Sequence, residues 1–275
     1  MTEYKPLTDE KSRFIAEKIY NKNASKTSSH ETPTMILVAG QPGAGKTAAA
    51  NNAKLELRQK GGFIHVDADK VRLEIPGGHT VPSSETQADC QKLVMHLRNF
   101  AIVGGRNILE EGTFRGERVF SETAEKMHEK GYNVEVIGVA AHMEQSRFNV
   151  QSRREKQREA GEPPRDVPEK YQEDAYRGYT ANMVNDTGTL DRVRVVNRAG
   201  QMLFDSTDHG NSLYGSVEEA LEKGRTLSVE QLAKISQDWT ELQQKCEDKR
   251  LSPQDMARIH EGRALFEECF KRETD

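Results

Sequence analysis

The sequence is poor in cysteine and in aromatic residues, and it carries no excess of positive charge. Its 275 residues include three cysteines and one tryptophan, and the formal net charge is −4 at pH 7. The widely spaced Cys90, Cys246 and Cys269 fit neither a disulfide framework nor a metal-ligand pattern, so we expect a protein of the reducing cytoplasm. The acidic balance offers no general attraction to nucleic acid or to anionic membranes, and we expect neither as a partner.

Long apolar runs and repeated segments are also missing. Residues 1–5 form no apolar signal region, no window is long and apolar enough to span a membrane, and the chain has no internal repeat. Charged residues make up 31% of the chain and hydrophobic residues 35%, which is typical of a modest core under a well-solvated surface. The length suits one large α/β domain with an appendage, or two small domains.

The most informative stretch is an apolar run that leads into a glycine-rich turn. Residues 35–47 read MILVAGQPGAGKT, and the end of this stretch fits G-x-x-x-x-G-K-[ST], the phosphate-binding P-loop. The apolar run predicts a buried parallel strand. A helix is predicted from Ala48, with its positive N-terminal end facing the turn. A chance match is the alternative, but strand, turn and helix follow in the order that the motif requires.

The P-loop predicts a site for a nucleoside triphosphate. Glycines allow tight turns in which successive backbone N–H groups point at one anion. Lys46 is expected to reach the β- and γ-phosphates, and the hydroxyl of Thr47 is expected to ligate Mg²⁺. The expected nucleotide-binding residues are Gly40, Gln41, Pro42, Gly43, Ala44, Gly45, Lys46 and Thr47.

Strand and helix patterns alternate along the chain, which predicts a P-loop NTPase-like α/β fold, a parallel sheet flanked by helices. Further strands are predicted at 63–66, 107–109 and 133–140, and the pair 193–198 and 201–205 reads as a hairpin or the edge of the sheet. We expect an N-terminal helix (14–20) and polar linker in residues 1–33, a P-loop kinase domain at 34–225, and a helical C-terminal extension at 226–275.

Acidic residues follow two of the predicted strands. Asp67 and Asp69 follow the strand at 63–66, and Glu111 follows the next strand in a short turn with Thr113 and Arg115. In open α/β sheets ligands bind beyond the carboxyl ends of the strands, so these side chains are expected beside the nucleotide. Helix capping is the alternative interpretation for the two aspartates.

A strongly basic helix is predicted at 143–160, and a loop with three prolines follows it at 161–168. The helix carries Arg153 and the loop presents Arg165. In phosphoryl-transfer enzymes, cations at this position close over the γ-phosphate, although a basic helix is more often a solvated face. Tyr171 begins an apolar stripe on the next predicted helix, for which packing is the favoured interpretation. His96 lies on the helix at 86–103 and is expected to be solvated or packed.

Taken in order, these motifs resemble the zeta toxin family, the kinases of toxin–antitoxin systems. The matching stretches are 40–47, 67–69, 111–115 and 197–203, with Arg153 and Arg165. The resemblance implies transfer of the γ-phosphate of ATP or GTP, with Mg²⁺, to the 3′-hydroxyl of the sugar in UDP-N-acetylglucosamine, which blocks cell-wall precursor synthesis. It also implies a helical antitoxin as partner.

The resemblance assigns individual roles. Asp69 matches the general base, Lys46 and Thr47 match the nucleotide and Mg²⁺ contacts, and Arg153 and Arg165 match the arginines around the transferred phosphate. Thr113 and Arg115 match contacts to the nucleotide sugar, and we expect Asp67 and Glu111 beside the same substrate.

Two positions depart from the family on the acceptor side. Met95 stands where the family has a substrate-binding glutamate, and Phe114 stands where the relative used for comparison has glycine. We therefore expect a UDP-sugar acceptor with a relaxed choice of sugar. A P-loop kinase of a different small molecule or of a nucleic-acid end would share everything except this pocket. A GTPase-like switch would need a guanine-reading signature, which is not found, and the intact Lys46, Thr47 and Asp69 disfavour an inactive binding module.

Overall fold

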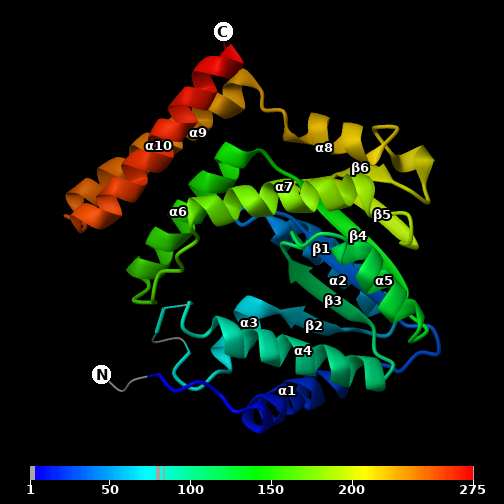
Figure 1. The fold of residues 1–275 in the computed structure, drawn as a ribbon. Helices are drawn as coiled ribbons and strands as arrows, with labels where there is room; N and C mark the ends of the chain where they lie inside the picture. The colour runs from blue at the N-terminus through cyan, green and yellow to red at the C-terminus, as the bar shows by residue number, and fades with distance from the viewer. Residues whose placement is uncertain (1–3, 79–80, 83, 275) are drawn as a thin grey trace.

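The computed structural model describes residues 4–78, 81–82 and 84–274 (Figure 1). Met1 to Glu3, part of the stretch that lacks a predicted signal region, lie outside the described residues. The strands are β1 (Thr34–Ala39), β2 (Ile64–Asp67), β3 (Ile108–Gly112), β4 (Asn133–Ala140), β5 (Arg192–Asn197) and β6 (Met202–Asp205). The helices are α1 (Asp9–Ala24), α2 (Lys46–Gln59), α3 (Ala68–Leu73), α4 (Gln87–Val103), α5 (Val119–His128), α6 (Met143–Glu159), α7 (Glu169–Asn185), α8 (Val217–Arg225), α9 (Val229–Asp248) and α10 (Pro253–Thr274), with a short 3-10 helix at His209–Asn211.

The strands form one sheet in the order β2-β3-β1-β4-β5-β6. The first five run parallel, and β6 pairs antiparallel with β5. The predicted α/β fold and the hairpin at 193–205 are therefore confirmed. Because β1 lies inside the sheet, its side chains are buried on both faces, as its unbroken apolar sequence requires.

Alternate residues of β1 face two separate layers of the core. Met35 and Leu37 join the apolar cluster that includes residues of α4, α5, α7 and α8, whereas Ile36 and Val38 join the cluster that includes α2. Helix α2, which follows the P-loop, therefore packs on one face of the sheet. Helices α4, α5, α7 and α8 pack on the opposite face (Figure 1).

The register of the strands brings the predicted acidic residues to one edge of the sheet. Asp67 at the end of β2 lies opposite Glu111 of β3, and Glu111 lies opposite Val38 of β1, two residues before the P-loop begins. The sequence predicts that this strand ends at Leu109, but β3 continues through Glu110 and Glu111 to Gly112. The carboxyl ends of three neighbouring strands therefore meet beside the P-loop.

The N-terminal helix is longer than the sequence suggested. Thr8 caps α1 by accepting a hydrogen bond from the backbone N–H of Lys11, but the helix continues to Ala24 through residues predicted as linker. Packing of α1 against α4 supports these last turns, which have a weak helical signal of their own.

The C-terminal helices α9 and α10 have a separate apolar cluster. It includes Trp239 and Phe266, and Phe148 of α6 joins it through an edge-to-face contact with Trp239, 5.3 Å between ring centroids. Both helices are capped at their N-terminal ends: Ser228 forms a capping box with Gln231, and Ser252 accepts from the backbone N–H of Asp255. The three-part division of the chain stays a prediction. Among the described helices, none is both long and apolar enough to cross a membrane.

Candidate functional site

The P-loop has the backbone that its glycines allow. Gly43 and Gly45 have φ values of 80° and 88°, in the left-handed region that other residues seldom adopt. A Cβ at Gly43 would lie 2.1 Å from the backbone oxygen of Ser146, so α6 can approach the loop only because this residue is glycine. The helix after the loop begins at Lys46, two residues earlier than predicted.

Two amide side chains, Gln41 of the P-loop and Asn149 of α6, connect the P-loop to the start of α6. The buried Gln41 donates from Nε2 to the backbone oxygen of Ala141 and to Oγ of Ser146, both at 2.9 Å. Asn149 of α6 donates to the backbone oxygen of Gly43 at 2.8 Å. The Gln41 side chain thus anchors the loop. Ser146 and Asn149 were missed by sequence reasoning, because they belong to no motif.

Lys46 lies at the centre of the charged groups. Its Nζ donates to the backbone oxygens of Gly40 and Gln41, at 2.8 and 3.1 Å. Burial lowers the pKa of Lys46 to about 8, and the charges that act on it are those of Glu111, Arg153, Arg165 and Asp69. The structure therefore brings together the lysine, the acid and both arginines that the sequence singled out.

The two aspartates after β2 have different surroundings. Asp67 caps α3, since its Oδ1 accepts from the backbone N–H of Asp69 at 2.9 Å. Asp69 instead pairs with Arg165, whose Nη1 contacts both oxygens of its carboxylate. The loop 161–168 is non-helical, as predicted, and spans from α6 to this contact. Burial and the nearby charge of Arg165 lower the pKa of Arg153, which places Arg153 in the same group.

Glu111 belongs to a network that includes a residue the sequence did not single out. His65 Nε2 lies 2.7 Å from Glu111 Oε1, and Lys70 Nζ lies 3.0 Å from His65 Nδ1. Lys54 Nζ is 3.6 Å from the same oxygen of Glu111. Burial acts to raise the pKa of Glu111, but the hydrogen bond to His65 and the positive charges lower it overall. Glu111 is therefore held as a carboxylate beside the P-loop.

A cation could be held by the same carboxylates. One ligand atom each from His65, Asp67 and Glu111 lie within 4.8 Å of one another. Mg²⁺ takes oxygen ligands, which Asp67 and Glu111 supply. Thr47, the predicted metal ligand, is exposed at the first turn of α2, so its hydroxyl is accessible. Asp67 and Glu111 therefore supply oxygen atoms of the kind that Mg²⁺ prefers.

The turn after β3 is fixed by α7. Asn182 donates to the backbone oxygens of Phe114 and Gly116, at 2.8 and 2.6 Å. A Cβ at Gly178 would lie 2.4 Å from the backbone oxygen of Arg115, so this glycine lets the helix touch the turn. Phe114 has a φ of 42°, a conformation that glycine adopts more easily, and its ring lies 5.8 Å from that of Phe120.

Arg115 corrects one packing prediction. Its guanidinium lies over the ring of Tyr171, 4.5 Å from the centroid, and is half-exposed near Asp174. Tyr171 is therefore outside the buried stripe that Tyr179 and Met183 do form. Thr113 in the same turn is partly buried.

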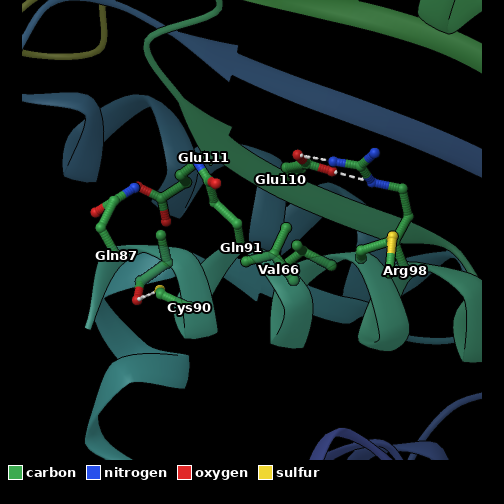
Figure 2. A pocket seen from close by; sticks show the side chains of 10 residues that line it. Val66, Gln87, Cys90, Gln91, Arg98, Glu110 and Glu111 are labelled. Atoms are coloured by element: carbon green, nitrogen blue, oxygen red, sulfur yellow. Dashed lines mark hydrogen bonds and ion pairs between the residues drawn. The ribbon is translucent and has the colours of Figure 1, made fainter. Parts of the chain in front are cut away.

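A cavity of about 300 Å³ lies between α4 and the ends of β2 and β3 (Figure 2). Met95 lines it, together with Gln87, Gln91 and Glu111. Figure 2 shows that Glu110, the other acid at this wall, is paired through two contacts with Arg98. His96 points elsewhere, since its Nε2 lies 3.0 Å from Asp9 of α1. The cavity therefore offers amides and Glu111, with Met95 at its edge.

Arg198 is a further residue beside the P-loop. A Cβ at Gly45 would lie 2.9 Å from Cγ of Arg198. Burial lowers the pKa of Arg198, and its Nη1 has no hydrogen-bond partner among the described residues. The motif 197–203 had pointed to this segment, but no role had been assigned to Arg198 within it.

Comparison with known proteins adds a family to this geometry. A model of the zeta toxin family matches residues 17–209. The chain is 27% identical over 195 residues to Toxin zeta of Enterococcus hirae, a match that covers 65% of each protein. It is also 27% identical over 210 residues to Toxin zeta of Streptococcus pyogenes, covering 70% of this chain and 69% of that one. The chain thus matches about two thirds of the length of these relatives.

Solved structures share the fold. The PezAT chromosomal toxin–antitoxin system of Streptococcus pneumoniae contains a chain that superposes with a TM-score of 0.69 at 22% identity, covering 88% of this chain and 99% of that chain. The AvrRxo1-ORF1:-ORF2 complex with ATP gives a TM-score of 0.55 at 15% identity, covering 94% of this chain and 82% of that chain.

Proposed function

Since this chain belongs to the zeta toxin family, we propose that it transfers the γ-phosphate of ATP or GTP to a sugar hydroxyl, the 3′-OH, of UDP-N-acetylglucosamine or a related UDP-sugar. The observation that carries the proposal is the grouping of Asp69, Glu111, Arg153 and Arg165 around Lys46. Phosphoryl transfer needs a phosphate cradle, a base for the acceptor and cations for the transferred oxygens. The P-loop supplies the cradle, and this group supplies the base and the cations.

The nucleotide binds on the P-loop and the start of α2 in this proposal. The backbone N–H groups of residues 40–47 and the N-terminal end of α2 surround the phosphates, and Lys46 exchanges its contacts to Gly40 and Gln41 for phosphate oxygens. Thr47 and Asp67 would hold Mg²⁺ near the nucleotide. When bound, the ion supplies positive charge to the β- and γ-phosphate oxygens. Arg198 beside Gly45 is positioned to add a further positive charge.

Asp69 is the proposed base. The acceptor oxygen bonds to the γ-phosphorus as the bond from that phosphorus to the bridging oxygen breaks. The proton of the acceptor hydroxyl passes to the Asp69 carboxylate, and the nucleoside diphosphate leaves. Arg165 must first leave Asp69, with which it is paired in this structure. The transferred phosphate is the stronger attraction for Arg165 and Arg153, because it carries more negative charge than one carboxylate.

The acceptor lies in the cavity beside Met95. The amides of Gln87 and Gln91 and the carboxylate of Glu111 can hydrogen-bond sugar hydroxyls there. Thr113 and Arg115 would hold the nucleotide part, because the forked donors of Arg115 suit a diphosphate. Since Met95 cannot accept hydrogen bonds as a carboxylate does, the choice of sugar is relaxed.

An antitoxin is the proposed partner. Solved structures with this fold are the PezAT toxin–antitoxin system and the AvrRxo1-ORF1:-ORF2 complex. We propose that a helical antitoxin binds this chain in the cytoplasm and that the free enzyme depletes a cell-wall precursor. Expression of the active enzyme in bacteria without a partner should therefore be toxic.

A direct assay tests the proposed reaction. Purified protein is incubated with ATP, Mg²⁺ and UDP-sugars, and the acceptor is analysed by mass for the gain of one phosphate. Lys46→Ala should abolish turnover and keep the fold, while Lys60→Ala, at the exposed end of α2, should not affect turnover. Turnover with some other hydroxyl compound and no UDP-sugar would favour the alternative, a P-loop kinase of a different small molecule or of a nucleic-acid end.

A further inference from the structure

The loop that carries Arg165 is not held by an apolar core. A cavity of about 320 Å³ lies beside this loop, between α6 and the C-terminal helices, and Arg154, Asp166, Trp239 and Arg258 are among the residues that line it. A loop beside an open space keeps its position through polar contacts, because apolar packing does not fill the space behind it. The contacts of residues 165–167 therefore decide where the Arg165 guanidinium lies.

Asp166 connects the loop to two helices, α6 and α10. Its Oδ1 accepts from Nε of Arg154 on α6 at 3.1 Å and from Nη1 of Arg258 on α10 at 2.7 Å. Arg154 is almost fully buried and also donates from Nη2 to Oδ1 of Asp255 at 2.8 Å. Two helices thus hold one carboxylate, and Asp255 of α10 also fixes the arginine on α6.

Backbone contacts hold the same loop from α6 and α7. Gln157 of α6 accepts from the backbone N–H of Arg165 at 3.0 Å, and Gln172 of α7 donates to the backbone oxygen of Val167 at 3.1 Å. Asp166 lies between these two anchors, and its side chain supplies the contact to α10. Together with the Arg165–Asp69 pair to α3, these contacts fix the loop from four helices, of which α10 lies beyond the residues that the family model matches.

We infer that Asp166 is a positioning residue for Arg165 and that α10 supports it through Arg258. The inference rests on the proposed function, because Arg165 acts on the transferred phosphate only there. Asp166 directly follows Arg165, so displacement of its carboxylate moves the backbone that carries the guanidinium. Arg154 and Arg258 also neutralise Asp166, which keeps this carboxylate from competing with the phosphate for Arg165.

The test compares two arginines on α10. Arg258 and Arg263 have equally exposed side chains, 31% each, and each pairs with one carboxylate. Arg263, however, contacts Glu267 on its own helix and Gln243 on α9, and it forms no hydrogen bond or ion pair with the 161–168 loop, all of which the structure describes. We expect R258Q to lower kcat by about 3- to 30-fold, since small displacements of a positioned group cost rate, with KM for the nucleotide unchanged. R263Q should match the wild type. D166N, which weakens both contacts of the carboxylate, should lower kcat at least as much as R258Q.

A positioning role predicts that R258Q acts only through Arg165. In the Arg165→Ala background, R258Q should lower kcat no further, whereas a general structural role would lower it again by the same factor. Limited digestion with trypsin measures how accessible the loop is and needs no activity assay. Cleavage after Arg165 should be faster in R258Q than in R263Q or the wild type.

The outcomes separate this inference from the proposed reaction. Equal kcat values for R258Q and R263Q, or equal trypsin cleavage after Arg165, would overturn the positioning role. If the wild type phosphorylates no acceptor, the proposed function fails, and faster cleavage in R258Q would still show that α10 fixes the loop.

Discussion

Arg165 and Asp69 are paired through both oxygens of the carboxylate, although 96 positions of the chain separate them. The pair joins the loop after α6 to the start of α3 and places the proposed base against the proposed phosphate-binding arginine. Each neutralises the other until a nucleotide arrives. In the proposed reaction the γ-phosphate would draw Arg165 away from Asp69. Asp69 would then be free to accept the proton of the acceptor hydroxyl.

The two aspartates after β2 should differ in their effects. Asp69→Asn keeps the size of the side chain and loses the proton acceptor, so kcat should fall by about 10²–10⁴-fold with nucleotide binding retained. Asp67→Asn should do less, because asparagine also caps helices well. Single-turnover rates and nucleotide titrations of both variants provide the measurement. A larger loss in Asp67→Asn would move the role of base to Asp67.

The arginines should act on rate. Arg153→Ala and Arg165→Ala should each lower kcat by on the order of 10³ or more if each stabilises the transferring phosphate as an arginine finger does. Nucleotide affinity should change far less. Steady-state kinetics with a separate binding measurement decide this point, since equal losses in affinity and in rate would make the arginines contacts of the ground state.

The titration of Lys46 should appear in the pH dependence of kcat/KM for the nucleotide. Burial lowers its pKa to about 8, so kcat/KM for the nucleotide should fall as the pH rises through 8. Lys46→Arg should not show this fall, at whatever activity it retains, because a guanidinium stays charged across the whole pH range of the assay. If kcat/KM of Lys46→Arg falls at the same pH, the titration belongs to another group.

The same pKa affects stability with a defined sign. In an unfolded chain lysine has a pKa of about 10.4. Between pH 8 and that value the unfolded state therefore binds more protons than the folded state. The cost of burying the charge is therefore present below pH 8 and is relieved as the pH rises above it. Lys46→Met should be more stable than the wild type at neutral pH, by a margin in the free energy of unfolding that shrinks in alkaline buffer.

Met95 should set the breadth of acceptor choice. A carboxylate at this edge of the cavity would accept hydrogen bonds from sugar hydroxyls, worth about 1.5–3 kcal/mol, or roughly ten- to hundredfold in relative kcat/KM. Met95→Glu should therefore raise selectivity for one sugar when UDP-N-acetylglucosamine, UDP-N-acetylgalactosamine, UDP-glucose and UDP compete at equal concentration. Leu73→Glu is the control, since Leu73 is exposed and does not line the cavity. An unchanged product ratio in Met95→Glu would place the acceptor elsewhere.

The sequence predicted the parts of the site that follow from local patterns. The P-loop, the acids after β2 and β3 and the basic helix could be located because strand order brings the carboxyl ends of neighbouring strands together. The family resemblance carried Arg153 and Arg165 to the same place. The sequence alone could not decide whether Asp67 is a helix cap or a catalytic acid, because both roles need the same residue type.

Long-range contacts could not be predicted in the same way. His65 reads as an ordinary strand residue, and only the register of β2 with β3 brings it to Glu111. Tyr171 has the spacing of a packed stripe, yet Arg115 covers it from a turn that lies far away in the sequence. The contact between Asp166 and Arg258 pairs two charged residues in a chain rich in both signs, so no local pattern distinguishes it.

Because β1 lies inside the sheet, the P-loop side and the arginine side of the site should move on different timescales. The backbone amides of β1 are bonded between β3 and β4 and are shielded by core on both faces, so they should exchange with solvent only through global unfolding. The P-loop that follows β1 inherits this rigid base. The 161–168 loop, held by polar contacts beside a cavity, should open locally far more often. Substrates would then enter and products would leave by movement of the arginine side, while the phosphate cradle stays in place.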